Sequence, residues 1–291
     1  MPAPRLPWKR FLPRSRPDAV NPLAELFPDI GVPDAAATPF RRSYVILLMP
    51  RSGSTMLART LLLSGLFGDP DEWFNGDPGS VAANYVAEGR GNTFYSYVSH
   101  IHETTTGANG VFGVQLSFEH LVHLDALTPL SHVVGPQACW FLLRRRNLVA
   151  QAISAYKAVA TGQYHSYQEA RAEATYDANV IADTIAAFVD WELGAFQFFR
   201  ERGLWPIELY YEDIVDEAFS IALFRNALQI YDDLEADTPA RQTYPITKIA
   251  TSENLRWEET FRSQYAKFLV EIERKRPRIL IPFPGTSAGG S

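Results

Sequence analysis

The 291-residue chain has one cysteine and lacks long apolar segments. Cys139 stands alone in the apolar run 138–143, so no intramolecular disulfide can form, which is typical of a reducing compartment. No run approaches the roughly eighteen apolar residues that a membrane-spanning helix needs. The start also lacks an apolar segment of the signal-peptide type. We therefore expect a cytoplasmic protein without a transmembrane segment.

Positive charge is not in excess either. The 27 Lys and Arg residues face 33 Asp and Glu residues, giving a formal net charge of −6. Such a chain has no overall attraction to nucleic acid, which we exclude as a partner. The histidines form no metal set: His120 and His123 are three apart on an expected helix, but no carboxylate framework accompanies them. We expect no metal.

The first 42 residues differ from the rest of the chain. The segment 1–17 holds five basic residues, no acidic residue and several prolines. We interpret residues 1–42 as a basic, proline-rich arm, either a solvated tail or a contact for an anionic membrane surface or polysaccharide. Residues 43–282 are expected to form the globular domain, and 283–291 a flexible tail.

Strand and helix patterns alternate between these ends. Short apolar runs predict strands at 43–49, 110–116, 139–144 and 206–211. Helical periodicity occupies the ranges 54–63, 81–88, 148–159, 214–230 and 257–275, and a long stretch from Tyr167 to about Phe199. This alternation predicts an α/β fold with a central parallel sheet and helices on both faces.

The run from Tyr44 to Thr55 is the most informative segment. An apolar strand leads into Pro50-Arg51-Ser52-Gly53-Ser54-Thr55, and a helical pattern follows. Backbone N–H groups converge at such a turn, and the helix N-terminus carries about half a positive charge. Gly53 lets the backbone approach a ligand closely, and Arg51 can fork onto phosphate or sulfate oxygens. The loop therefore predicts an oxyanion site.

This loop lacks the lysine of nucleoside triphosphatases. In G-x-x-x-x-G-K-[ST] the Lys follows the second Gly, whereas here the cation, Arg51, precedes Gly53. A nucleotide-dependent kinase is thereby disfavoured, and no clear magnesium-binding Asp follows a second strand. A non-catalytic nucleotide-binding module stays open as a further alternative.

A second cationic segment follows the third expected strand. Three arginines, Arg144 to Arg146, precede a helix that carries Ser154, eight residues after Arg146. Crowded guanidinium groups favour a shared anion, so Arg146 and Ser154 are expected to converge on one phosphate; a solvated basic turn is the alternative. Two anion sites at neighbouring strand ends indicate one ligand with two anionic groups.

Together these segments resemble sulfotransferases. The 50–55 loop is similar to their 5′-phosphosulfate loop, and Arg146 with Ser154 is similar in spacing to their 3′-phosphate pair. The chain resembles the bacterial trehalose 2-sulfotransferase family over about 43–261, in the segments 51–55, 68–74, 109–113, 149–154, 161–165 and 210–213.

The resemblance implies a P-loop-type sulfotransferase fold and a cosubstrate, 3′-phosphoadenosine 5′-phosphosulfate (PAPS). It implies sulfuryl transfer, without a metal, to a hydroxyl of a carbohydrate or glycolipid, and a homodimer by analogy. The residues it assigns to PAPS binding are Arg51, Ser52, Gly53, Ser54, Thr55, Arg146, Ser154 and Tyr211.

The acceptor side follows from the same resemblance. Glu72, in a Trp/Phe setting that can raise its pKa, matches the family's general base. Trp73 and Phe74 are expected to form a sugar-stacking wall. Gln163, Tyr164 and His165 are expected to line the acceptor side, with His165 as an alternative base. Gln115 departs from the family, which tends to have Lys there.

Overall fold

A parallel sheet organises the part of the chain that the structure describes. In this computed structural model the described residues are 20–33, 40–163, 169, 171–231 and 252–278. The strands are β1 (Arg42–Leu48), β2 (Val111–Ser117), β3 (Cys139–Arg144) and β4 (Ile207–Tyr210). They lie in the order β2-β1-β3-β4, and all paired strands run parallel. The expected parallel α/β sheet is confirmed, with strand bounds within one residue of those predicted.

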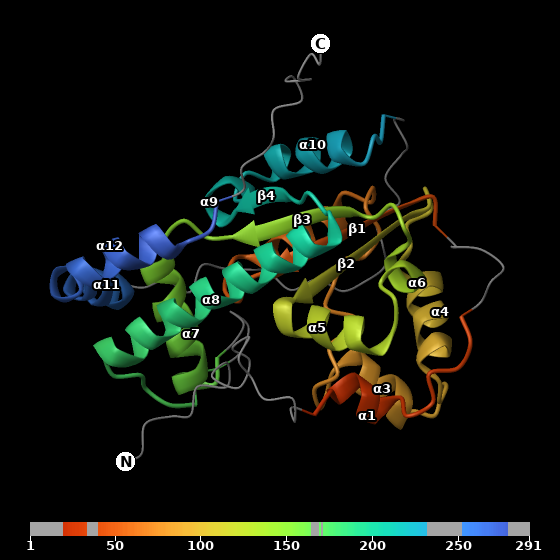
Figure 1. Ribbon diagram of the computed structural model, residues 1–291, viewed down its shortest axis with the longest axis horizontal. Coiled ribbons are helices and arrows are strands. Elements are labelled where there is room, and N and C mark those ends of the chain that lie inside the picture. The colour runs from red at the N-terminus through yellow and green to blue at the C-terminus, as the bar shows by residue number, and fades with distance from the viewer. Residues whose placement is uncertain (1–19, 34–39, 164–168, 170, 232–251, 279–291) are drawn as a thin grey trace, which may run out of the picture.

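Strand β1 is buried on both faces, which explains its unbroken apolar sequence. Alternate side chains point to opposite sides of a strand. Tyr44, Ile46 and Leu48 therefore enter one apolar cluster, with α2 (Ser54–Leu63) and α10 (Glu217–Ala227). Val45 and Leu47 enter the other cluster. Its covering helices include α5 (Phe118–Leu127), α7 (Leu148–Thr161) and α8 (Ala178–Arg202). Figure 1 shows α10 on one side of the sheet and these three on the other.

The remaining helices are shorter or lie at the periphery. They are α1 (Pro22–Leu26), α3 (Val81–Ala87), α4 (Phe94–Thr105), α6 (Ser131–Val134), α9 (Tyr211–Ile214), α11 (Ser252–Gln264) and α12 (Ala266–Lys275). Helix α4 was not expected from the sequence, and α5 was expected only as a helix that carries His120 and His123. The range 257–275 is broken at Tyr265 between α11 and α12, and α11 begins earlier than expected.

The long helix begins later than the sequence predicted. The expected start at Tyr167 is wrong, because described residues 171–177 are not helical and α8 begins at Ala178. The Asp177 carboxylate accepts hydrogen bonds from the N–H groups of Asn179 and Val180, at 3.0 and 3.1 Å. This N-cap ends the irregular segment, since it satisfies backbone donors that a longer helix would bond internally.

Part of the expected N-terminal arm packs on the domain. Leu23 and Phe27, in and after α1, are both buried in the main apolar cluster. Asn21 caps α1 and donates from its amide to the carbonyl of His123 on α5, at 2.8 Å. The five basic residues of the segment 1–17 and the tail 283–291 lie outside the described residues, whereas Arg42 already belongs to β1; the domain boundaries stay predictions.

The order of the strands creates a switch point between β1 and β3. From β1 the chain passes to β2 on one side, and β3 then pairs with β1 on the opposite side. Open α/β sheets bind ligands outside the carboxyl ends of the strands at such a point. The loop after β1 with Arg51, and the end of β3 with Arg144 followed by Arg145 and Arg146, lie at this point.

Candidate functional site

The loop between β1 and α2 adopts a conformation suited to an anion. Arg51 has φ 63°, which is unusual for a residue with a side chain, and Gly53 has φ 86°. Ser52 is fully buried, and its hydroxyl donates to the carbonyl of Met49 at 2.5 Å. That hydroxyl therefore closes the turn. A Cβ added to Gly53 would lie 2.5 Å from Cδ2 of Tyr211, so only glycine fits against this ring.

The N-terminus of α2 follows directly. Gly53 is its N-cap and supplies no side-chain hydrogen bond, and Ser54 and Thr55 occupy the first turn. The first N–H groups of a helix lack intrahelical acceptors and carry the positive end of the helix dipole. Thr55 is exposed. The predicted oxyanion site therefore has backbone donors available.

Helix α7 holds the loop in place. The Gln151 amide donates to the carbonyl of Pro50 at 2.7 Å, and Arg51 Nε donates to Ser154 Oγ at 3.1 Å. Residues three apart lie on one face of a helix, so both contacts come from the same side of α7. The structure thus brings together Arg51 and Ser154, two residues that the sequence assigned to one ligand.

Among the three arginines at the end of β3, Arg145 is the one whose charge affects the pKa of Arg51. Burial lowers the pKa of Arg51, and the charge of Arg145 lowers it further. The Arg145 guanidinium lies 4.5 Å from the centre of the Tyr211 ring, which itself packs against Gly53. The buried Nε of Arg145 has no hydrogen-bond partner among the described residues. Burial also lowers the pKa of Arg145, and two desolvated guanidinium groups of like charge are stabilised by a nearby anion.

Arg146 is engaged elsewhere. Its guanidinium forms a two-pronged ion pair with Asp213, at 2.8 and 2.6 Å, and lies over the Tyr210 ring. Both partners of the ion pair are largely exposed. The structure does not join Arg146 to Ser154, and their shared phosphate stays a prediction. Sequence reasoning did not single out Arg145, although its position in the arginine run was a signal.

Arg144 needs no bound anion. Its side chain is 2% exposed and forms ion pairs with Glu192 of α8, at 2.6 Å, and with Glu208 of β4. The expectation that three crowded arginines share an anion is therefore wrong for Arg144. Its compensating carboxylates come from elements 48 and 64 residues away, which spacing within the run cannot reveal.

Glu72 lies in the irregular segment between α2 and α3. Burial raises its pKa to about 7, with further contributions from the carboxylates of Asp71 and Asp77. Its side chain is still 36% exposed, so a substrate can reach it. His120 Nδ1, on α5, lies 3.5 Å from Glu72 Oε2. Burial lowers the pKa of His120 to about 4, so this neighbour is neutral near pH 7.

Gln115 joins the Glu72 segment to the anion loop. Its N–H donates to the carbonyl of Asp71 at 2.9 Å, and its amide donates to the carbonyl of Ser54 at 3.0 Å. Its side chain is almost fully buried in β2. Glu72 therefore lies at the β2 side of the edge, Arg51 at β1 and Arg145 at β3. Gln115 thus links two parts of the site, one through its backbone N–H and the other through its side-chain amide.

The expected sugar wall is mostly buried. Phe74 is fully buried and packs on Phe94 and Tyr97. Trp73 is 7% exposed, and its indole N–H donates to the carbonyl of Asp69 at 2.8 Å. Their substrate-binding roles stay predictions, which this burial does not favour. Gln163 follows the end of α7, whereas Tyr164 and His165 lie outside the described residues.

Two classes of feature are absent from the described part of the chain. Within those residues no group of His, Cys, Asp and Glu is arranged to hold a metal ion. No described helix is long and apolar enough to cross a bilayer.

Comparison with known proteins assigns the chain to a family. The family model described as Stf0 sulphotransferase matches residues 43–264. A trehalose 2-sulfotransferase of Mycobacterium tuberculosis is 27% identical over 206 residues, which cover 58% of this chain and 77% of the relative. The enzyme of the same name from Mycolicibacterium smegmatis is 26% identical over 207 residues, with the same two coverages.

A solved structure is also similar. The sulfotransferase domain of the Synechococcus PCC 7002 olefin synthase has a TM-score of 0.46 and 14% identity, over 85% of this chain and 98% of that domain. The family match spans the strand–loop–helix unit, the Glu72 segment and the arginine run, and confirms the predicted sulfotransferase over a kinase. The chain belongs to the Stf0 sulphotransferase family.

Proposed function

We propose that this protein transfers a sulfuryl group from PAPS to a hydroxyl of a carbohydrate or glycolipid. One observation carries the proposal: at the switch point of the sheet, Arg51 contacts Ser154 beside the α2 N-terminus, and Arg145 lies over the Tyr211 ring that packs against Gly53 of the same loop. A donor with a phosphosulfate and a second phosphate offers anionic groups to both arginines.

The donor side uses residues of β1, α2 and β3. Arg51 and the first N–H groups of α2 hold the phosphosulfate, and Arg145 faces the second anionic group. Preorganised donors of this kind are worth about 3–4 kcal/mol each when charge develops in the transition state. Sulfuryl transfer needs no metal in this arrangement, because the loop itself supplies the positive charge.

The acceptor side uses Glu72. Its carboxylate accepts the proton of the acceptor hydroxyl while that oxygen bonds to sulfur. The bond between sulfur and the bridging oxygen breaks, and its electron pair leaves with 3′-phosphoadenosine 5′-phosphate (PAP). A base with a pKa of about 7 suits this task near neutral pH, because half of it is ionised there.

The acceptor class rests on the relatives. Two of them bear the name trehalose 2-sulfotransferase, so a hydroxyl on a disaccharide or a glycolipid headgroup is our first expectation for this chain. Neutral, hydroxyl-rich acceptors are compatible with the acidic surroundings of Glu72, which include Asp71 and Asp77. A homodimer and a cytoplasmic location stay predictions.

Calorimetric titration with PAP and with ATP tests the donor, in EDTA and in magnesium. Tight, metal-independent binding of PAP supports the proposal, whereas magnesium-dependent preference for ATP refutes it in favour of a kinase. Mass spectrometry of carbohydrates and glycolipid extracts incubated with isotopically labelled PAPS then tests transfer. PAP binding without any labelled product indicates a non-catalytic nucleotide-binding module.

A further inference from the structure

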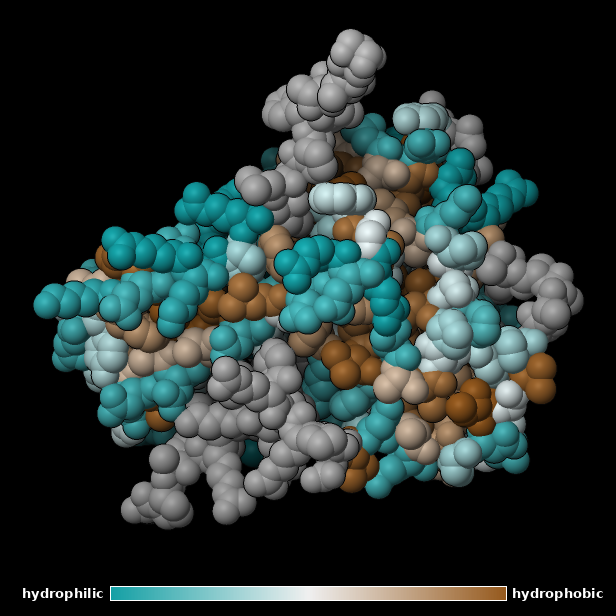
Figure 2. Space-filling model, viewed as in Figure 1, coloured by the Kyte–Doolittle hydropathy of each residue, from teal (hydrophilic) through white to brown (hydrophobic). Residues whose placement is uncertain are grey.

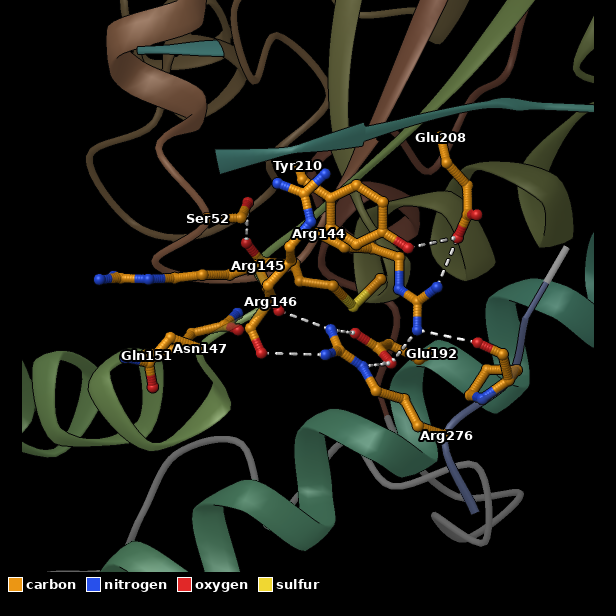
Figure 3. Close-up of polar contacts among 12 residues, drawn as sticks. Ser52, Arg144, Arg145, Arg146, Asn147, Gln151, Glu192, Glu208, Tyr210 and Arg276 are labelled. Atoms are coloured by element: carbon orange, nitrogen blue, oxygen red, sulfur yellow. Dashed lines mark hydrogen bonds and ion pairs between the residues drawn. The ribbon is translucent and has the colours of Figure 1, made fainter. Parts of the chain in front are cut away.

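The backbone of the turn after β3 is held from both sides by charged side chains. The carboxylate of Glu212 accepts the N–H groups of Arg146 and Asn147, at 3.0 and 3.1 Å. The guanidinium of Arg276 donates to the carbonyls of Arg145 and Arg146, at 2.6 and 3.2 Å. Figure 3 shows the Arg276 group reaching this turn from the right, while the Arg145 side chain extends away from it to the left.

Arg276 is itself held firmly. It follows the last residue of α12, is 9% exposed, and donates to both oxygens of Glu192 at 2.8 and 2.7 Å. Burial raises the pKa of Glu192, but the hydrogen bonds from Arg276 and Arg144 outweigh it and hold the pKa below its usual value. One buried carboxylate therefore pairs with and orients two guanidinium groups, and Glu208 supplies a second negative charge to Arg144.

Arg276, the C-cap of α12, lies on the buried side of this helix. Ile272 and Arg276 are buried, whereas five charged residues of the helix are exposed: Lys267, Glu271, Glu273, Arg274 and Lys275. Hydrophilic side chains accordingly cover much of the α11–α12 end, at the left of Figure 2. Arg276 lies beyond the region 43–264 that the family model matches.

We propose that Arg276 is a positioning residue for the donor pocket, which fixes the peptide planes of the turn so that Arg145 stays over the Tyr211 ring beside the Arg51–Gly53 loop. This inference rests on the proposed function. The turn cannot rotate its Arg145 or Arg146 carbonyl without breaking a charge-assisted hydrogen bond to Arg276. A shift of the Arg145 backbone moves its guanidinium off the Tyr211 ring and away from the anion.

The side chain must be arginine. Its planar group has five donors in a fixed fork, and here these reach two carboxylate oxygens and two carbonyls. A lysine in its place keeps the positive charge beside Glu192 but has a single nitrogen, which cannot serve four acceptors at those positions. Arg276→Lys therefore keeps the positive charge beside Glu192 but loses the hydrogen bonds that hold the turn.

Glu208→Gln is the matched control. It removes a charge from the same network, but Arg144 keeps Glu192 and the carbonyl of Pro277, at 2.6 and 3.0 Å. The hydrogen bonds of Arg276 to the turn are untouched. Any general weakening of the network therefore appears in both variants, whereas loss of the turn geometry appears only in Arg276→Lys.

The test measures PAP affinity by calorimetry, and KM and kcat for the acceptor, in wild type and both variants. We expect Arg276→Lys to weaken PAP binding about tenfold, as for loss of one charge-assisted contact, with acceptor KM within about twofold. Glu208→Gln should leave PAP affinity within about twofold. Equal losses in the two variants, or unchanged PAP affinity in folded Arg276→Lys, overturn the inference.

Hydrogen exchange supplies a readout without ligand. In Arg276→Lys the amides of Arg146 and Asn147 should exchange faster than in wild type. If wild type binds no PAP, the proposed function fails, and this exchange alone decides whether Arg276 fixes the turn. If the variant does not fold, wild type supplies the test. Added PAP should then slow amide exchange at residues 146–147 and at Arg276. Unchanged amide exchange at Arg276 refutes the inference.

Discussion

Replacing Glu72 with glutamine tests the centre of the proposed chemistry. The amide has nearly the same shape as the carboxyl group but cannot accept the acceptor's proton. General-base catalysis contributes about 10²–10⁴-fold, so kcat at pH 8 should fall by at least a hundredfold. PAP affinity should stay within about twofold, because the donor cations Arg51 and Arg145 lie at β1 and β3 while Glu72 lies at the β2 side.

The pH profile gives an independent measure of the same residue. Only the ionised form of Glu72 acts as base, and its pKa is about 7. The rate of wild type should therefore be level above pH 8 and fall about tenfold per pH unit well below 7. The glutamine variant should lose this acid limb. A variant with near-normal kcat, or with the limb intact, would falsify the assignment of Glu72.

Glu119 provides a control with similar chemistry. It lies on α5 next to His120, and burial raises its pKa to about 8, with a further contribution from Asp77. Glu119→Gln removes a carboxyl of raised pKa without touching the proposed base, so kcat should stay within a few-fold. A hundredfold loss in Glu119→Gln with little loss in Glu72→Gln would reverse the assignment.

The raised pKa of Glu72 predicts the direction in which Glu72→Gln changes the stability of the protein. The folded pKa of Glu72 lies above its usual value of 4.5, so folding favours the protonated form. The stability contributed by this group therefore falls as pH rises from about 4.5 to 7, and the cost is complete above 7. Partial exposure of the side chain screens that cost. Thermal unfolding at pH 8 should show a Tm at or above that of wild type.

Three further changes test the donor loop and the surroundings of the base. Gly53→Ala places a methyl 2.5 Å from the Tyr211 ring at φ 86°, so Tm and PAP affinity should both fall, measured by calorimetry. Arg51→Lys should weaken PAP binding about tenfold or more, because one ammonium cannot contact Ser154 and fork onto an anion; unchanged affinity contradicts this role. Asp77→Asn removes a charge that raises the pKa of Glu72, so the acid limb of the rate profile should shift to lower pH by less than about one unit.

Local signals account for the parts of the fold that were predicted well. The unbroken apolar run of β1, the glycine turn and the helix that follows are all encoded within about twenty consecutive residues. The strand–loop–helix unit that carries the predicted oxyanion site could be located for that reason. Helix starts were predicted less well, since α8 begins where the Asp177 side chain caps it and not where apolar periodicity begins.

The arginine run shows where such reasoning ends. Three consecutive guanidinium groups look equivalent in sequence, yet Arg144 enters a buried ion network, Arg145 lies over Tyr211 beside the anion loop, and Arg146 pairs with Asp213. The partners of each arginine are carboxylates and aromatic rings from α8, β4 and α9. The pairing of Glu72 with His120 likewise depends on how α5 packs against the segment before α3.

The amino-acid sequence alone determined the parallel α/β architecture, the anion loop and the family resemblance, because these depend on residue types at short spacing. The tertiary structure decided that Arg145 packs on Tyr211 beside the Arg51 loop, which carboxylates neutralise Arg144 and how Arg276 holds the turn after β3. The physical reason is that a charged side chain takes the partner that burial and backbone geometry bring within hydrogen-bond range, and that partner lies far away along the chain.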